Sequence, residues 1–256
     1  KMNRSVKIIA IVNQKGGVGK TTTAINVAAE LAGKNTPVLL LDLDPQGNAS
    51  SGLGIQKDTA PKTTFDLLMG TANLADCIHE SHIPGLYVLP ANSNLAAAEV
   101  NLVGKLQREF SLKNGLQSST FKYILIDCPP SLGLLTINGL TAATTVLIPV
   151  QAEYYALEGL SQLLDTIGAV RGSTNPHLDL LGIALTMYDR RNSLSEQVKE
   201  ELSKYFGDKL LKSIVPRNVR LAEAPSYGKT IYEHDRWSKG SRAYKSLSKE
   251  IKTRLK

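Results

Sequence analysis

Directly after an apolar stretch, the chain reads Asn13-Gln14-Lys15-Gly16-Gly17-Val18-Gly19-Lys20-Thr21-Thr22. Closely spaced glycines let the backbone curl so that successive N–H groups point inward, toward the oxygens of a phosphate. The helix expected over Lys20–Leu31 adds the partial positive charge of its N-terminus at the same place. Because an expected strand precedes this segment and an expected helix follows it, the sequence predicts a phosphate-binding loop.

The residue types in the loop suggest roles for its side chains. Lys20 is expected to reach the β- and γ-phosphates of a nucleotide, and the Thr21 hydroxyl is expected to ligate Mg²⁺. The loop departs once from the usual pattern G-x-x-x-x-G-K-[ST], because Gln14 occupies the first glycine position, and Lys15 adds a second cation. The alternative, a glycine-rich turn with incidental lysines, is disfavoured by this spacing and context.

Short apolar runs alternate with segments of helical period along the rest of the chain. Strands are expected at Val6–Val12, Val38–Leu43, Leu86–Leu89, Tyr123–Asp127, Thr145–Val150, Leu180–Thr186 and Ser213–Val215. Helices are expected at Lys20–Leu31, Leu95–Phe110, Leu132–Ala143, Leu157–Val170, Leu194–Tyr205 and over the last ~15 residues. Near-continuous apolar strands suit a sheet covered on both faces, and their alternation with helices indicates parallel pairing. We therefore predict an α/β fold, a doubly wound, mostly parallel sheet with helices on both faces, forming one domain over residues 1–256.

Composition excludes several classes of protein. The 256 residues are 42% apolar and 21% charged, which is ordinary for a globular protein and too apolar for a disordered one. The two cysteines, Cys77 and Cys128, cannot supply a disulfide scaffold or a Cys-rich metal or iron–sulfur site. No apolar run approaches the ~20 residues that a membrane-spanning helix needs.

The net charge of +7 is unevenly placed. Residues 1–215 hold 19 Lys+Arg and 19 Asp+Glu, whereas residues 216–256 hold 11 and 4. Such asymmetry points to an anionic partner, either nucleic acid or a membrane surface. The alternative is a solvated basic helix that binds nothing. We assign this basic region to the same domain as the rest of the chain.

Two of the expected strands end in aspartates. Asp42 and Asp44 lie two residues apart, so they point the same way, at the end that faces the ligand crevice of a parallel sheet. Asp127 ends another apolar strand in the Walker B form, in which the acid holds Mg²⁺ directly or through water. Each motif is weak alone. Together with the phosphate loop, the two motifs predict a nucleoside triphosphatase.

Together the three motifs resemble the deviant Walker A ATPases of the ParA/MinD group. The segment Asp44-Pro45-Gln46-Gly47-Asn48 and the tract from Val215 to Lys229 are closest to the chromosomal ParA/Soj branch. The resemblance runs from about Val6 to Leu255, essentially the whole chain. It implies a P-loop NTPase fold, ATP and Mg²⁺ as ligands, and ATP hydrolysis that is slow without a stimulating partner.

The resemblance also implies roles for particular residues. Lys15 would be the signature lysine that crosses a dimer interface to the other subunit's phosphates, and Asp44 would position or activate the attacking water. Asp42 stays open between orienting the loop and binding metal through water. Pro216 and Asn218 would lie over the adenine ring, with a plain structural turn as the alternative.

For function, the resemblance implies an ATP-bound homodimer that holds double-stranded DNA without sequence preference and segregates chromosomes or plasmids. A ParB-type partner with a basic N-terminal segment would stimulate hydrolysis, and the protein would be cytoplasmic and nucleoid-associated. The expected DNA contacts are Arg217, Arg220, Lys229, Arg236, Lys239 and Arg242.

Other interpretations stay open. Arg217 and Arg220 could instead pair with Glu223 or brace the adenine turn. Two further function classes are a MinD-like membrane-positioning ATPase and a metabolic P-loop ligase. The apolar stripe of the last helix, Tyr244, Leu247, Ile251 and Leu255, favours a core-facing helix over a membrane-inserting one, because it is narrow.

Overall fold

A seven-stranded sheet forms the centre of the molecule in the computed structural model, which describes residues 6–153 and 155–256. The predicted domain range also takes in residues 1–5 and 154, which lie outside the described residues. The strands are β1 (Lys7–Ile11), β2 (Val38–Asp42), β3 (His79–Glu80), β4 (Leu86–Leu89), β5 (Tyr123–Asp127), β6 (Thr145–Gln151) and β7 (Asp179–Thr186). Their order is β3-β4-β2-β5-β1-β6-β7, and only the edge pair of β3 with β4 is antiparallel within these ranges.

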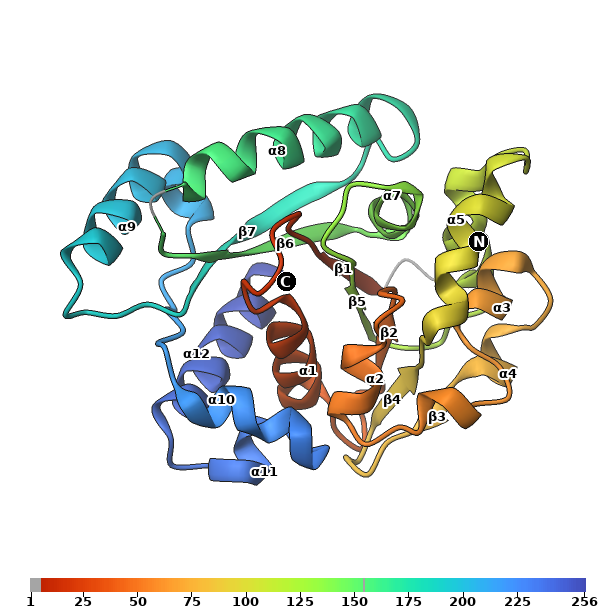
Figure 1. Cartoon of the computed structure of the whole chain (residues 1–256), viewed down its shortest axis with the longest axis horizontal. Coiled ribbons are helices and arrows are strands. Elements are labelled where there is room, and N and C mark those ends of the chain that lie inside the picture. Colours follow the sequence, from red (N-terminus) through yellow and green to blue (C-terminus); the bar gives the residue numbers. More distant parts are fainter. Residues whose placement is uncertain (1–5, 154) are drawn as a thin grey trace.

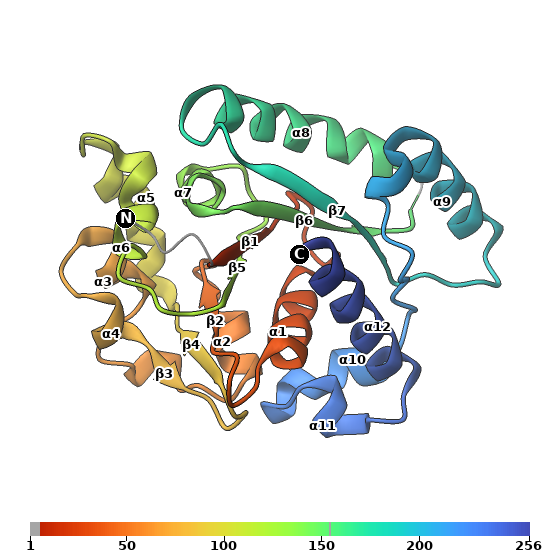
Figure 2. The same ribbon diagram turned by 180° about the vertical axis from the view of Figure 1, so that it is seen from behind.

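Helices cover both faces of this sheet (Figures 1 and 2). The helices are α1 (Lys20–Leu31), α2 (Asn48–Gly52), α3 (Thr64–Met69), α4 (Leu74–Cys77), α5 (Ala96–Val103), α6 (Ser111–Gly115), α7 (Leu134–Ala142), α8 (Ala156–Ser173), α9 (Ser193–Phe206), α10 (Val219–Glu223), α11 (Ile231–Asp235) and α12 (Lys239–Arg254). Successive strand residues enter opposite cores: Leu39 and Leu41 belong to one hydrophobic cluster, and Val38 and Leu40 to the other. The predicted doubly wound α/β fold is confirmed.

The C-terminal helix α12 packs against α1 as part of the second of these cores. Its apolar stripe is buried at Tyr244, Leu247 and Ile251, as the sequence predicts. The Tyr244 hydroxyl also lies 3.0 Å from Thr23 Oγ1 on α1. The helix that follows the phosphate loop is therefore held by the most C-terminal helix of the chain. Among the described residues, no helix combines the length and the apolar character needed to cross a membrane.

Two predicted elements are wrong. The helix expected over Leu95–Phe110 ends at Val103, and the backbone then turns through Gln107, whose φ is +53°. The strand expected at Ser213–Val215 is an extended segment beside β7, with isolated bridges at Leu210 and Pro216. Pro216 has no N–H to donate to a ladder, so regular pairing stops there. The sequence does not predict the short elements β3, α2, α3, α4, α6, α10 and α11, because they are too short to show a period.

We expect Leu247→Ala to lower the free energy of unfolding by about 2–5 kcal/mol, because the side chain is fully buried between α12 and its neighbours. Lys249→Ala, an exposed position on the same helix, should change it by less than about 0.5 kcal/mol. Urea denaturation followed by circular dichroism measures both. Equal small effects would mean that α12 contributes nothing to the stability of the core.

Candidate nucleotide-binding site

Three strand ends meet at the carboxyl edge of the sheet and place the predicted motifs side by side. Asp42 of β2 and Ile11 of β1 flank Asp127 of β5 in one row of the register. The phosphate loop leaves β1 at this point, where the chain connections diverge to the two sides of the sheet. Ligands of open α/β sheets bind at such a point.

The loop has the conformation that its glycines predict. Gly17 and Gly19 have φ values of +75° and +87°, which residues with a Cβ rarely adopt. A further contact fixes the loop to the sheet, because the Thr186 hydroxyl at the end of β7 donates to the Val18 carbonyl at 2.7 Å. The end of β7 thus helps to hold the loop in shape.

Lys20 is buried at the base of the loop. Its ammonium group donates to the Lys15 carbonyl at 3.0 Å, so it lies across the loop that it closes. Burial lowers the pKa of Lys20, and the negative charge of Asp127 opposes that shift. A partly dehydrated ammonium beside inward-facing backbone N–H groups is suited to a multiply charged anion such as a polyphosphate.

Thr21 and Asp127 form a pair that fits a divalent cation. The Thr21 hydroxyl donates to Asp127 Oδ2 at 2.7 Å, while Asp127 Oδ1 is buried and has no hydrogen-bond partner within the described structure. Burial, together with the charge of Asp42, raises the pKa of Asp127 well above its usual range. A cation would relieve both the unpartnered oxygen and the cost of the buried charge. Within residues 6–153 and 155–256, no group of three or more His, Cys, Asp or Glu is arranged so that it could hold a metal ion by itself. Mg²⁺ commonly needs only one or two protein carboxylates beside phosphates and water.

Asp42 and Asp44 differ in what their carboxylates contact. Asp42 is fully buried, and its Oδ2 accepts hydrogen bonds from the Ser50 N–H at 2.9 Å and the Ser50 hydroxyl at 2.7 Å. Its Oδ1 accepts from the Asp44 N–H at 3.2 Å. Burial raises the pKa of Asp42 to about 6, against the effect of these donors. The contacts favour the loop-orienting role for Asp42 over the metal-binding one.

Asp44 lies beyond the end of β2 in the turn that leads to α2. Its Oδ1 accepts from the Gln46 N–H at 2.9 Å, and its carbonyl accepts from the Gly47 N–H at 2.8 Å. Gly47 has a φ of +62°, so this tight turn needs glycine. The turn holds the Asp44 carboxylate at the edge of the sheet where the phosphate loop lies.

Lys15 and Gln14 connect the loop to the segment after β6. The Lys15 side chain is half exposed and forms an ion pair with Glu153, and the Gln14 amide donates to the Gly159 carbonyl at 3.0 Å. Within the single chain, the Lys15 charge is therefore already partnered. That Lys15 reaches the phosphates bound by a second subunit stays a prediction.

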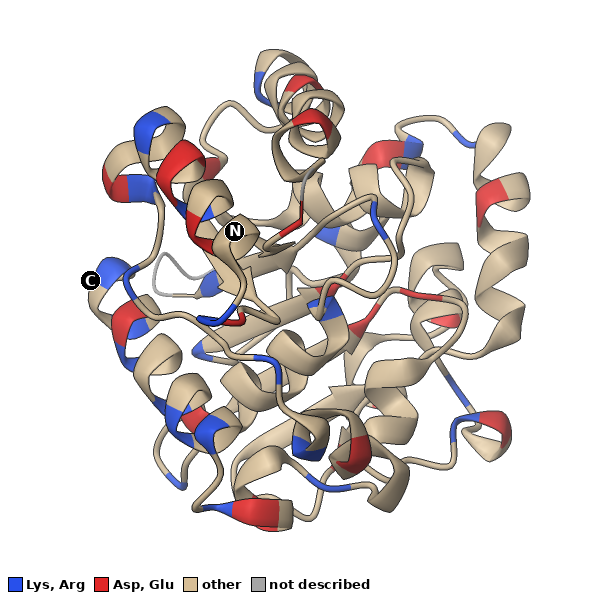
Figure 3. Ribbon diagram, turned by 60° about the vertical axis from the view of Figure 1, so that its left-hand side comes forward, with Lys and Arg blue, Asp and Glu red and all other residues tan. Residues whose placement is uncertain are grey.

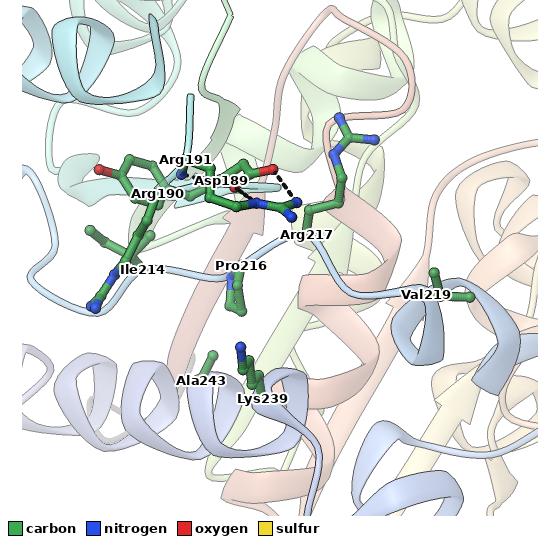
Figure 4. A pocket seen from close by; sticks show the side chains of 10 residues that line it. Asp189, Arg190, Arg191, Ile214, Pro216, Arg217, Val219, Lys239 and Ala243 are labelled. Atoms are coloured by element: carbon green, nitrogen blue, oxygen red, sulfur yellow. Dashed lines mark hydrogen bonds and ion pairs between the residues drawn. The ribbon is translucent and has the colours of Figure 1, made fainter. Parts of the chain in front are cut away.

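One of the two predicted adenine residues lies at a cleft of about 800 Å³ between the segment after β7 and the start of α12 (Figure 4). Pro216 lines this cleft. Asn218 instead caps α10, because its side-chain oxygen accepts from the Arg220 N–H at 2.9 Å. The Asn218 side-chain oxygen is therefore used in the structural turn that the sequence left open as the alternative. The contact of Pro216 and Asn218 with adenine stays a prediction.

The residues predicted to contact DNA fall into three groups: those that line the cleft, one that is paired with acidic residues, and those that are exposed elsewhere. Arg217 and Lys239 line the cleft, and Figure 4 shows the Lys239 side chain pointing toward Pro216. Arg220 is partly neutralised, because it lies 2.9 Å from Glu223 and 3.8 Å from Asp235. This is the pairing that the sequence left open as an alternative. The remaining predicted contacts are Lys229, Arg236 and Arg242, all of them exposed, and the Arg236 guanidinium lies 4.6 Å from the centre of the Trp237 ring.

Two further arginines line the same cleft and were missed from the sequence. Arg190 and Arg191 follow β7 and line the cleft together with Arg217 and Lys239 (Figure 4). Arg191 forms a bidentate ion pair with Asp189, which lowers the pKa of that carboxyl to about 2. Two adjacent arginines directly after a strand could have indicated this site. Residues 1–215 carry no net charge, however, so the distribution of charge along the chain does not mark them.

Comparison with known proteins gives a consistent result at the level of sequence. A family model described as an AAA domain matches residues 6–180. The sporulation initiation inhibitor protein Soj of Bacillus subtilis is 53% identical over 247 residues, which cover 96% of this chain and 98% of that protein. The chromosome partitioning protein ParA of Caulobacter vibrioides is 49% identical over 253 residues, covering 97% and 95%.

A solved structure extends the comparison to the ligands of a relative. The crystal structure of cobyrinic acid a,c-diamide synthase from Mycobacterium smegmatis, with bound ADP and magnesium, is 38% identical to this chain. The TM-score is 0.82, and the match covers 95% of this chain and 93% of that one.

We expect Ser50→Ala to destabilise the fold by about 1–3 kcal/mol at about pH 8, because the ionised Asp42 carboxylate would lose a buried donor. The folded-state pKa of Asp42 is raised, so the folded state binds a proton more readily than the unfolded chain does. Below about pH 5 the carboxyl is mostly protonated, and the deficit of the variant should shrink. Urea midpoints at the two pH values measure this.

Ser51→Ala is the matched control, because the Ser51 hydroxyl donates to the Gly47 carbonyl and not to Asp42. A deficit of Ser50→Ala that is the same at both pH values would contradict the account of Asp42.

Proposed function

The chain belongs to the ParA/Soj family of chromosome-partitioning ATPases, and from this membership we propose that it is a DNA-binding partition ATPase timed by nucleotide hydrolysis. The observation that carries the proposal is the row of strand ends that brings Lys20, the Thr21–Asp127 pair and Asp44 to one edge of the sheet. These are the groups that hydrolysis of a nucleoside triphosphate requires: a phosphate-binding cation, a metal site and an acid near the attacking water.

In the proposed mechanism, the backbone of Gly16–Thr22 binds the phosphates of ATP, and Lys20 contacts the β- and γ-phosphates. Thr21 and Asp127 would hold Mg²⁺, which would neutralise charge on the phosphate oxygens. Asp44 orients the attacking water. Asp42 acts on the reaction only by holding the turn that carries Asp44.

Lys15 would couple hydrolysis to dimerisation. Crossing to the phosphates of a second subunit requires Lys15 to leave Glu153. Both side chains of this ion pair are about half exposed, and exposed pairs contribute only about 0–1 kcal/mol. Lys15 placed near the γ-phosphate of the other subunit would contribute more free energy than this ion pair, because it would stabilise charge that develops during phosphoryl transfer. ATP would therefore favour the dimer, and hydrolysis would release it.

We assign the DNA-binding surface to the basic cleft, defined by Arg190, Arg191, Arg217 and Lys239, and to the exposed cations of α12 beside it. Figure 3 shows Lys and Arg recurring along the helix that ends at the C-terminus. Cations drawn from several loops suit phosphates arrayed along a duplex, and such contacts carry no sequence information. A dimer would present two such surfaces, so its affinity should exceed that of the monomer steeply.

A metabolic ligase is the second candidate, because one solved relative is a cobyrinic acid a,c-diamide synthase. That function would require ATP consumption in proportion to a small carboxylate. The relatives named for chromosome partitioning share more identity, 49% and 53% against 38%, which favours the partition function. Phosphate release that rises with added small carboxylate, in a chain that does not bind DNA, would favour the ligase instead.

We expect the chain to bind a fluorescent random-sequence duplex with ATP, and much more weakly with ADP or without nucleotide. Raising the salt concentration should weaken binding, because phosphate contacts release counterions. Arg217→Glu should reduce the affinity roughly tenfold or more while leaving ATP-dependent dimerisation intact. Lys204→Glu, the same charge change on α9 outside the cleft, is the control.

Two variants separate nucleotide binding from hydrolysis. Lys20→Ala should abolish dimerisation with ATP, because the phosphates lose their buried cation. Asp44→Ala should hydrolyse ATP at least ~10²-fold more slowly and accumulate as an ATP-bound dimer that still binds DNA. Size-exclusion chromatography with light scattering and a phosphate-release assay measure the two effects. Normal turnover in Asp44→Ala would remove Asp44 from the mechanism.

A further inference from the structure

One continuous segment, residues 91–103, contacts the chain beyond both strands that end in an aspartate. It follows β4 and passes through the 3₁₀ turn Ser93–Leu95 directly into α5. Figures 1 and 2 show α5 beside α7, the helix that comes after β5. We call residues 91–103 the bridging segment.

The start of the bridging segment holds the turn after β2. The Ala91 N–H donates to the Ser50 hydroxyl at 3.0 Å, and that hydroxyl donates to the buried carboxylate of Asp42. Gly47 lies so close to the Ala91 carbonyl that a Cβ at this position would overlap with the carbonyl oxygen. The turn that carries the Asp44 carboxylate is therefore packed directly on the backbone of the bridging segment.

The α5 part of the bridging segment holds the start of α7. Residues 128–133 connect Asp127 to this helix, whose N-cap residue is Gly133. Glycine has no side chain that could accept a hydrogen bond from the first N–H groups of a helix. Glu99 supplies an acceptor from α5, because its Oε1 lies 3.5 Å from the Leu135 nitrogen. A carboxylate is also the favourable charge at a helix N-terminus.

Gly133 gives this carboxylate the space that it occupies. A Cβ at Gly133 would overlap with Glu99 Oε1, although the backbone there is extended, with a φ of −77°. The close approach of the carboxylate, and not the backbone conformation, therefore requires glycine. A second contact fixes the same connection, because the Thr136 hydroxyl donates to the Ser131 carbonyl at 2.7 Å. The connection after Asp127 is thus held by α7 at one point and by α5 at another.

We propose that Glu99 is a positioning residue for hydrolysis, which holds the connection after Asp127 in place relative to the turn that carries Asp44. Both contacts belong to one short segment, so displacement of the Glu99 carboxylate would uncouple the two. Because phosphoryl transfer depends on the alignment of metal, phosphate and attacking water, the loss should lower turnover more than nucleotide binding. The inference rests on the proposed hydrolysis of ATP, and Glu99 acts through its contact with α7 and not on the nucleotide.

Steady-state hydrolysis separates positioning from binding. Glu99→Ala should lower kcat at least roughly fivefold, while the KM for ATP stays within about twofold. Glu99→Gln should restore most of kcat, because its amide oxygen can accept the same hydrogen bond from the Leu135 N–H. Asn101→Ala, an exposed position on α5, is the control and should leave both constants unchanged. An equal loss of kcat in Glu99→Gln and Glu99→Ala would overturn the role of the hydrogen bond.

Gly133→Ala tests the same contact from the other side. The added methyl group should displace the flexible Glu99 side chain, so this variant should lose kcat as Glu99→Ala does. In the Glu99→Ala background that space is empty, and Gly133→Ala should then lower kcat by less than about twofold, because both changes remove one interaction. Full additivity of the two losses would mean that the residues act separately, and the proposal would be wrong.

Hydrogen–deuterium exchange distinguishes this inference from the proposed function. In the nucleotide-free chain, Glu99→Ala should speed exchange of the first amides of α7 at least about threefold, and Glu99→Gln should not. This result in a protein that hydrolyses no ATP would contradict the proposed ATPase and leave the contact between α5 and α7 intact. Equal kcat in Glu99→Ala and the unaltered chain would overturn the inference and leave the ATPase intact.

Discussion

The structure depends on how two buried carboxylates are accommodated on neighbouring strands. Asp42 and Asp127 occupy the same row of the sheet. Burial raises the pKa of both carboxyls, and the charge of Asp42 raises the pKa of Asp127 further. Asp42 is satisfied by Ser50 and by the backbone of Asp44, whereas Asp127 has one donor, Thr21, and one oxygen without a partner. The two acids thus differ: one shapes a turn, and the other retains capacity for a cation.

The phosphate loop contacts the end of β7 and the segment that follows β6. At β7, the Thr186 hydroxyl donates to the Val18 carbonyl, and the chain then continues into Arg190 and Arg191 of the basic cleft. After β6, Glu153 forms the ion pair with Lys15, and the Gly159 carbonyl on α8 accepts a hydrogen bond from Gln14. Because one short loop contacts both segments, a nucleotide-dependent movement of the loop would change both sets of contacts.

The accuracy of the sequence predictions follows the length and regularity of each element. The boundaries of α1 and β5 match their predicted ranges, and at the start of α1 the N-cap residue is the last glycine of the phosphate loop, Gly19. The predicted helix over Leu95–Phe110 breaks after Val103, where apolar residues continue the helical period although the backbone turns. Val100, Val103 and Leu106 remain exposed there, so hydrophobic spacing overstated the helix. Apolar residues at helical spacing predict that one face of a helix is apolar. They cannot show whether another element of the protein covers that face.

By itself, the sequence determined the phosphate loop, the strand ends with their aspartates and the α/β class, because each depends on residues close together in the chain. Only the tertiary structure decided that Ser50 satisfies Asp42 while Asp127 keeps a free oxygen. It also decided that Arg190 and Arg191 share a cleft with Lys239. These features join residues from separate elements. Their positions follow from how helices and strands pack, which local spacing does not encode.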